Sequence, residues 1–176
     1  MGSKKTQVWD LVGAYPICQI CGSEKVVRDA WAEWSMASQE WILKAIFDHF
    51  SCENCGDTGV PDWHLDEDFR RLRIQRLNDL LRRGQADHAT IVMTAGVQAE
   101  GDAFVHRAME ETMQFDDFCE DNDPHGEHDF GAFEIDGQKL FFKIDYFDLE
   151  LQQHSRDAAN PNCTHRVLTV MLASEY

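Results

Sequence analysis

Two Cys-x-x-Cys pairs are the residues of this chain whose types and spacing most directly indicate chemistry. The first pair is Cys18 and Cys21, and the second pair is Cys52 and Cys55. A glycine follows each pair, and glycine gives the backbone the freedom that a tight turn needs to direct two sulfurs toward one point. Four thiolates are the ligand set of a structural zinc site. The sequence therefore predicts a Zn²⁺ ion bound by these four cysteines.

The segment between the two pairs must bring the second pair back beside the first. It has two stretches rich in Trp, Val, Ile and Phe, 26–34 and 41–50, which are separated by a polar stretch. We therefore predict a β-hairpin, and with it a zinc-ribbon domain over residues 1–62. Such a small domain has too little core to fold without its metal. Three tryptophans are expected to supply part of that core, and a stacking platform for nucleic-acid bases is the alternative. They are Trp31, Trp34 and Trp41.

A disulfide framework and an iron–sulfur cluster are the alternatives to zinc. The first residues lead to Trp9 and Asp10 without the apolar core of a signal peptide. No apolar run approaches the roughly 20 residues that a membrane span needs. We therefore expect a cytoplasmic protein, and zinc is favoured because thiols stay reduced in that compartment.

The second strong feature of the sequence is its negative charge. The 176 residues carry 32 acidic and 16 basic side chains, a formal net charge of −16. Residues 110–150 alone hold 14 acids against Lys139 and Lys143. Such a surface repels a phosphate backbone, so we expect this part of the chain not to bind DNA directly, and a basic, nucleic-acid-binding protein is the better partner. The alternative is that the charge serves only solubility.

Residues 63–176 are predicted to form a separate, acidic α+β domain. Helical spacing of apolar residues indicates helices over 65–83 and 104–115, and the arginines of the first helix are expected to pair with acids of the same chain. The expected strands are 89–94, 131–135, 139–146 and 166–173, with Asp136-Gly137 as a hairpin turn. Helices and hairpins do not alternate strictly, which favours a small antiparallel sheet packed with two helices over a wound parallel sheet.

A long acidic loop, 116–129, holds the densest group of polar side chains, and loops of this length usually have a function. The candidate binding residues in it are Asp116, Asp117, Glu120, Asp121, Asp123, His125, Glu127, His128 and Asp129. The two histidines and the carboxylates beside them suit a second, transition-metal site, whereas turn and capping roles are the structural alternative. No nuclease, hydrolase or phosphate-loop motif accompanies them, which favours a protein without catalytic activity.

Three motifs of the C-terminal part resemble those of a known family. They are Asn-Asp-Pro-His-Gly-Glu-His-Asp-Phe-Gly at 122–131, Phe-Lys-Ile-Asp-Tyr at 142–146 and Arg-Val-Leu-Thr-Val-Met-Leu-Ala-Ser-Glu-Tyr at 166–176. The family is an uncharacterised bacterial domain, frequent on plasmids and other mobile elements, and the resemblance extends over about residues 70–176. The N-terminal part looks like a zinc ribbon appended to proteins from similar settings. The resemblance transfers no catalytic residues, and it implies an accessory protein of mobile DNA.

These observations lead to one hypothesis of function and two alternatives. The first is a zinc-binding acidic protein that inhibits a nucleic-acid-binding component of host defence, of anti-CRISPR or anti-restriction type, by imitating the charge of nucleic acid. The second is a metal-dependent hydrolase that uses His125 and His128. The third is a nucleic-acid-binding zinc ribbon. Its contacts would come from Lys25, Arg28, Trp31, Trp34 and Lys44.

Overall fold

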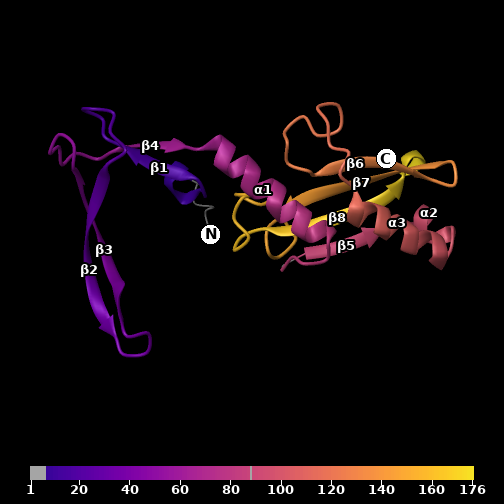
Figure 1. The fold of residues 1–176 in the computed structure, drawn as a ribbon, viewed down its shortest axis with the longest axis horizontal. Helices are drawn as coiled ribbons and strands as arrows, with labels where there is room; N and C mark the ends of the chain where they lie inside the picture. The colour runs from indigo at the N-terminus through magenta and orange to yellow at the C-terminus, as the bar shows by residue number, and fades with distance from the viewer. Residues whose placement is uncertain (1–6, 88) are drawn as a thin grey trace. The chain divides into compact units, whose positions relative to one another are not determined.

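A computed structural model describes residues 7–87 and 89–176 of the chain. The chain divides into two compact units, an N-terminal unit, Met1–Asp66, and a C-terminal unit, Glu67–Tyr176 (Figure 1). The mixed α+β fold class predicted from the sequence is confirmed. Within the described part of the chain, no helix has the length and apolar character needed to cross a membrane.

The N-terminal unit is built from two separate pairs of strands. β2 (Val26–Ser35) and β3 (Glu40–Cys52) form the predicted hairpin. β1 (Ala14–Ile17) pairs with β4 (Asp62–Leu65), and a 3₁₀ turn, η1 (Val8–Asp10), precedes them. Because β4 pairs with β1, it belongs to the N-terminal unit, although it lies beyond the expected boundary at residue 62.

The hairpin tryptophans do not form a core. Trp31, Trp34 and Trp41 are exposed, so the prediction that they supply buried packing is wrong. They pack only in edge-on pairs on the ribbon surface: Trp34 against Trp41 with ring centroids 5.7 Å apart, and Trp31 against Phe47 at 5.0 Å. The physical reason is that a two-stranded ribbon has no third layer within its own unit to cover either face.

The C-terminal unit is a four-stranded sheet with helices. Its elements in chain order are α1 (Glu67–Arg82), β5 (Ala89–Met93), α2 (Ala95–Ala99), α3 (Asp102–Gln114), β6 (Phe130–Ile135), β7 (Gln138–Phe147), β8 (His165–Leu172) and the 3₁₀ turn η2 (Ala173–Glu175). The strand order is β5-β8-β7-β6. The β7 pairs on both sides are antiparallel, as expected, whereas β5 runs parallel to β8. The predicted Asp136-Gly137 turn joins β6 and β7, and both residues have the positive φ of a type I′ turn.

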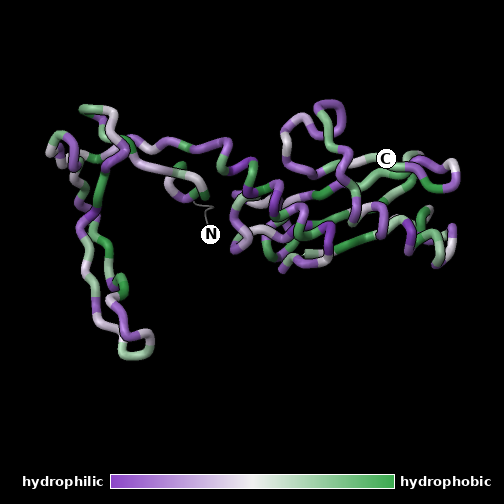
Figure 2. The backbone as a smooth tube through the Cα atoms, viewed as in Figure 1, coloured by the Kyte–Doolittle hydropathy of each residue, from purple (hydrophilic) through white to green (hydrophobic). Residues whose placement is uncertain are grey.

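The core of the C-terminal unit lies between the helices and one face of the sheet. The helices contribute Leu81, Val97, Phe104 and Ala108, and the strands contribute Ile135, Leu140, Phe142, Ile144, Leu168 and Val170. Figure 2 shows the hydrophobic stretches of the sheet strands. Burying each large side chain of this kind is worth about 1.5–3 kcal/mol. This core holds both ends of the acidic loop, which connects α3 to β6.

Candidate metal centre and acidic loop

The four cysteines come together at the base of the hairpin. Cys18 follows β1 directly and Cys52 ends β3, so the hairpin carries the chain out and returns it to the first pair. The four Sγ atoms lie within 4.8 Å of one another. The Sγ atoms of Cys18 and Cys55 are 3.6 Å apart, and those of Cys21 and Cys52 are also 3.6 Å apart. Residues from two distant segments thus form one cluster of thiols.

The geometry of this cluster fits a tetrahedral metal site. Four thiolates at the usual Zn–S bond length have sulfurs about 3.8 Å apart, because the bonds meet at a tetrahedral angle. A disulfide requires a sulfur separation near 2.05 Å, so the observed spacing is that of ligands around an ion. The cluster can therefore hold a metal ion, and it is the only such group found among the described residues.

The two cysteine turns have the same backbone design. The N–H of Gly22 donates to the carbonyl of Cys18 at 2.9 Å, and the N–H of Gly56 donates to the carbonyl of Cys52 at 2.8 Å. Both glycines have positive φ, 70° and 76°, which is why glycine follows each pair. The first cysteine of each pair is buried and the second is exposed.

Groups around the cluster shift the pKa values of Cys21 and Cys55 in opposite directions. The side-chain amide of Asn54 lies 3.5 Å from Cys21 Sγ and, with the backbone of Ser23, lowers the pKa of Cys21 to about 6. The backbone at Asp57 favours the Cys55 thiolate, but the neighbouring thiols and partial loss of hydration outweigh it and raise the pKa of Cys55 to about 12. Without a cation, four thiolates would repel one another at these distances.

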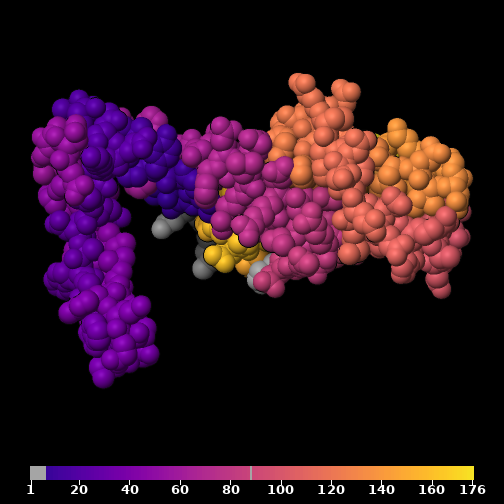
Figure 3. All heavy atoms as spheres, viewed as in Figure 1, coloured from indigo at the N-terminus to yellow at the C-terminus, as the bar shows by residue number. Residues whose placement is uncertain are grey.

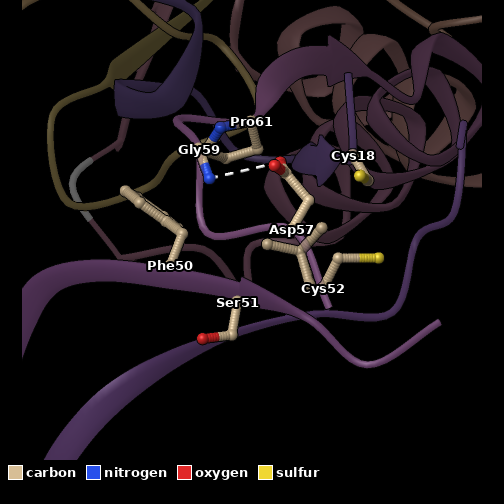
Figure 4. A pocket seen from close by; sticks show the side chains of 8 residues that line it. Cys18, Phe50, Ser51, Cys52, Asp57, Gly59 and Pro61 are labelled. Atoms are coloured by element: carbon tan, nitrogen blue, oxygen red, sulfur yellow. Dashed lines mark hydrogen bonds between the residues drawn. The ribbon is translucent and has the colours of Figure 1, made fainter. Parts of the chain in front are cut away.

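A small cavity of about 10 Å³ lies beside the two buried cysteines (Figure 4). Phe50 and Pro61 form part of its wall, and the N–H of Gly59 donates to Asp57 Oδ2 at 3.2 Å across it. Its volume suffices for no more than a water molecule. The protein thus shields one side of the cluster from solvent.

The acidic loop is anchored by a buried carboxylate. Asp123 is 7% exposed. Its Oδ1 accepts from the N–H of Glu127 at 2.8 Å, and its Oδ2 accepts from the N–H of His128 at 3.1 Å. Gly126 occupies the turn between them with φ of 63°. Asp123 is therefore used by the fold, and its carboxylate faces the backbone of its own loop.

His128 is also directed inward. Its ring stacks on Phe118 with centroids 3.7 Å apart and an interplanar angle of 4°. Nδ1 is 2.9 Å from Asp79 Oδ1 and Nε2 is 2.7 Å from the amide nitrogen of Gln75. In this arrangement Nδ1–H donates to Asp79 and Nε2 accepts from Gln75. Both ring nitrogens are thus engaged with partners from α1, which gives no support to His128 as a ligand of a second metal.

Arg82 of α1 binds the end of α3, from which the chain enters the acidic loop. It is 1% exposed, and its Nη1 donates to the carbonyls of Thr112 at 3.1 Å and Phe115 at 2.8 Å. Its Nη2 donates to Asp79 Oδ1 at 2.5 Å, and its guanidinium lies 4.9 Å from the Phe118 ring centroid. Burial raises the pKa of Asp79, but hydrogen bonds from His128 and Arg82 outweigh it, so this pKa lies below its usual value.

A buried polar network continues beneath the loop. Asn78 is fully buried; its amide donates to the Glu127 carbonyl at 2.9 Å and to the Tyr146 hydroxyl at 2.7 Å, and its Oδ1 accepts from Arg166 Nε at 3.1 Å. Burial, and then the charge of Asp129, raise the pKa of Glu127. Burial likewise raises the pKa of Tyr146 and lowers that of Arg166.

Of two other loop residues, Asp129 is half-buried and His125 is exposed. Burial, followed by the charge of Asp123, raises the pKa of Asp129. His125 is exposed and lines an open depression with Asp129, Lys143 and Tyr176. Gly131 follows the loop as the second residue of β6, and a Cβ atom there would lie only 2.2 Å from Cε1 of the buried Phe142. The start of β6 therefore requires a residue without a side chain.

The remaining loop carboxylates face solvent. They are Asp116, Asp117, Glu120 and Asp121. No described residue forms an ion pair with any of these four. Other acids of this region do have basic neighbours, such as Asp136 with Arg107 at 2.5 Å and Asp145 with Lys143 at 2.9 Å. The candidate residues thus separate into an inward group that fixes the loop and an outward group that carries uncompensated charge.

Sequence reasoning missed three residues of the polar network: Asn78, Arg82 and Arg166. The sequence signal for Asn78 and Arg82 was their helical spacing in α1. They lie four residues apart on the same buried face as Ile74 and Leu81. Phe69 and Leu72 are also among the helically spaced apolar residues of 65–83, but both are exposed. Internal pairing of the helix arginines is confirmed by Arg70 with Asp157 at 2.9 Å, and by Arg82 with Asp79.

Comparisons with known proteins agree with the resemblance noted in the C-terminal part. Residues 93–175 match a family described as a protein of unknown function, DUF3768. The match covers α2, α3, the acidic loop and β6 to β8. No curated protein matches the chain, and no solved structure matches it.

Proposed function

We propose that the chain is a zinc-stabilised acidic interaction protein, and that its acidic loop binds a basic, nucleic-acid-binding protein in place of nucleic acid. The proposed partner class is a restriction or CRISPR component of host defence against mobile DNA. The observation that carries the proposal is the outward group of four unpaired carboxylates, Asp116, Asp117, Glu120 and Asp121, on a loop that Asp123 and His128 hold in place.

The charge of the C-terminal unit supports this choice of partner. Residues 67–176 carry 22 acidic and 11 basic side chains, a net charge of −11. Duplex DNA presents one negative charge per roughly 1.7 Å of its axis, and arginine and lysine pair with carboxylates much as they pair with phosphates. A loop that is already ordered loses little conformational entropy on binding, so more of the charge–charge attraction contributes to affinity.

The N-terminal unit contributes a structural metal under this proposal. We propose Zn²⁺ as the ion because a set of four thiolates at tetrahedral spacing favours it over cations that prefer oxygen ligands. Bound zinc would stabilise the two turns and the base of the hairpin, and the zinc has no open coordination position for catalysis once four sulfurs are bound.

Capture from host lysate tests the proposal, with the wild-type chain and two variants as bait. One variant converts the outward group to Asn and Gln. The control variant removes the same number of exposed carboxylates from the N-terminal unit, at Glu24, Asp29, Glu40 and Glu53. We expect wild type and the control to retain a basic nucleic-acid-binding protein that added duplex DNA or high salt releases, and the outward-group variant to lose it. Equal capture by both variants, or capture that resists salt and DNA, contradicts the proposal.

The nucleic-acid-binding zinc ribbon has one observation in its favour, the exposure of its tryptophans. Its cations are less suited to phosphate, because Lys44 Nζ is 2.6 Å from Glu33 and Arg28 Nη2 is 2.5 Å from Asp48. A gel shift with single-stranded DNA and the full zinc-loaded chain checks this alternative. We expect no shift at physiological salt, and a shift that Trp31→Ala abolishes would favour the alternative.

A further inference from the structure

One face of the distal part of the hairpin, residues 30–34 and 41–46, is made of apolar side chains. In an antiparallel pair, directly opposed residues project to the same face, and residues two apart along a strand share that face. The register opposes Ala30 to Ile46, Ala32 to Leu43 and Trp34 to Trp41. We call these six side chains the apolar face of the ribbon; they are Ala30, Ala32, Trp34, Trp41, Leu43 and Ile46.

Side-chain contacts agree with this assignment of faces. Trp34 and Trp41 meet at 5.7 Å on the apolar face. The ion pair of Glu33 with Lys44 lies on the opposite face, because both residues adjoin members of the apolar face along their strands. All six members of the apolar face are exposed, and Figure 3 shows that the distal part of the hairpin extends away from the rest of its own unit. The apolar face thus has no cover within the N-terminal unit.

The exposed area of the face is large. At about 250 Å² for a whole tryptophan, Trp34 at 46% exposure and Trp41 at 70% together expose close to 300 Å². Leu43 and Ile46 are 61% and 51% exposed, which brings the face to roughly 500 Å². A patch of this size is as large as the largest on a typical monomeric protein, and such patches often have a function. Two such faces together present about 1,000 Å², which reaches the lower limit for a specific protein–protein interface.

The arrangement of large and small side chains on the face suits a second copy of the same chain. β3 contributes a ridge of large side chains, Trp41, Leu43 and Ile46, whereas β2 contributes the small Ala30 and Ala32 and the large Trp34. A two-fold axis parallel to the strands places β3 of one copy over β2 of the other. It brings Leu43 onto the partner's Ala32, Ile46 onto the partner's Ala30 and Trp41 onto the partner's Trp34. A large residue then faces a small one at the first two contacts, as close packing requires, and two aromatic rings meet at the third.

The charges point to the same occupant. The apolar face carries no charge, so two copies can bring it together without desolvating an ion, although each chain has a net charge of −16. A basic protein would find no carboxylate on this face, and nucleic acid would find no cation. We therefore infer that the hairpin is a homodimerisation element, in which two copies of the chain pack their apolar faces around a two-fold axis. This inference is independent of the partner proposed for the acidic loop.

The first test measures the mass of the zinc-loaded full chain by light scattering and sedimentation from about 1 to 100 μM, which detects a dimer with a dissociation constant in or below this range. We expect a species of twice the 20.3 kDa chain mass. Leu43→Glu should give monomers, whereas Ile42→Glu, which puts the same charge on the opposite face, should leave the dimer intact. A monomeric wild type overturns the inference, and so does equal dissociation in the two variants.

A volume exchange tests the two-fold arrangement itself. Ala32→Leu places a second large side chain against the partner's Leu43 twice per dimer, so we expect roughly 100-fold weaker dimerisation. Leu43→Ala removes that ridge residue. Mixing the two variants restores one large and one small residue at both contacts, so native mass spectrometry should show the mixed dimer in preference to either homodimer. Equal zinc content in both variants verifies folding. Random mixing, with no preference for the mixed dimer, overturns the proposed arrangement.

Discussion

Replacing Arg82 with methionine is predicted to destabilise the C-terminal unit strongly. The guanidinium is the buried donor that satisfies two carbonyls at the end of α3, those of Thr112 and Phe115, and it forms the ion pair with Asp79. Methionine can fill much of the volume of the arginine stem but donates no hydrogen bond. The substitution therefore removes the donors and leaves the acceptors in place.

The magnitude follows from these acceptors. Removing one member of a buried ion pair typically costs about 3–5 kcal/mol, and each buried carbonyl left without a donor costs about 1–3 kcal/mol. Asp79 keeps its contact with His128 and is partly exposed, which reduces the first cost. We therefore expect the free energy of unfolding of the C-terminal unit to fall by about 3 kcal/mol.

Urea unfolding can observe the two units separately. All five tryptophans lie in the N-terminal unit, and the three α-helices of the described residues lie in the C-terminal unit. Helical circular dichroism should therefore show a midpoint lowered by roughly 2 M urea in Arg82→Met, while tryptophan fluorescence keeps its wild-type transition. Arg83→Met is the matched control, because Arg83 is the exposed neighbour. A loss below about 1 kcal/mol, or one equal to that of the control, would refute the reasoning.

Three further predictions use the same two signals. Cys52→Ser should abolish zinc binding, measured by metal analysis, and alter tryptophan fluorescence, while helical circular dichroism persists. Cys119→Ser is the control, and it should change neither zinc binding nor fluorescence, because Cys119 lies outside the cluster. Gly131→Ala should destabilise the C-terminal unit by about 3 kcal/mol or more in urea, because the new Cβ meets a fully buried ring. Gly96→Ala should cost less, because its Cβ displaces only the exposed Glu175 carboxylate and the hydrogen bonds that this carboxylate accepts from Thr94, Gly96 and Leu172. Glu127→Gln should stabilise the unit at pH 7, because the raised pKa of Glu127 means that its charge destabilises the folded state. This cost is absent below the unfolded pKa near 4.3 and develops as the pH rises from there through the folded pKa, so the advantage of Gln in urea titrations should disappear below pH about 4.3. An advantage that persists there would contradict the assignment.

The elements that the sequence predicted are those with a local physical cause. The cysteine turns follow from spacing and glycine, because both sulfurs of a pair come from one turn. The hairpin and helices follow from patterns within one segment. The short pairing of β1 with β4 could not be predicted, since each strand has only four residues and its partner lies in a distant segment.

Burial of polar side chains and exposure of apolar ones depended on tertiary contacts. Asn78 and Arg82 are buried on α1 because residues from α3, the acidic loop and β8 supply their partners. The pattern of α1 alone favoured Phe69 and Leu72 for the buried face, and both are exposed. No signal within a helix reveals which polar residues will find partners far along the chain.

The most distinctive motif of the chain, residues 122–131, is explained largely by folding. Asp123 caps the loop backbone, Gly126 takes a positive φ, His128 bridges to α1, and Gly131 passes beneath a buried ring. A motif with these roles fixes the shape of the loop without contacting a ligand. The side chains free to recognise a partner are therefore the outward carboxylates just before it. Substitutions within the motif should affect binding through the order of the loop, whereas substitutions of the outward group should affect binding alone, with the unfolding free energy unchanged.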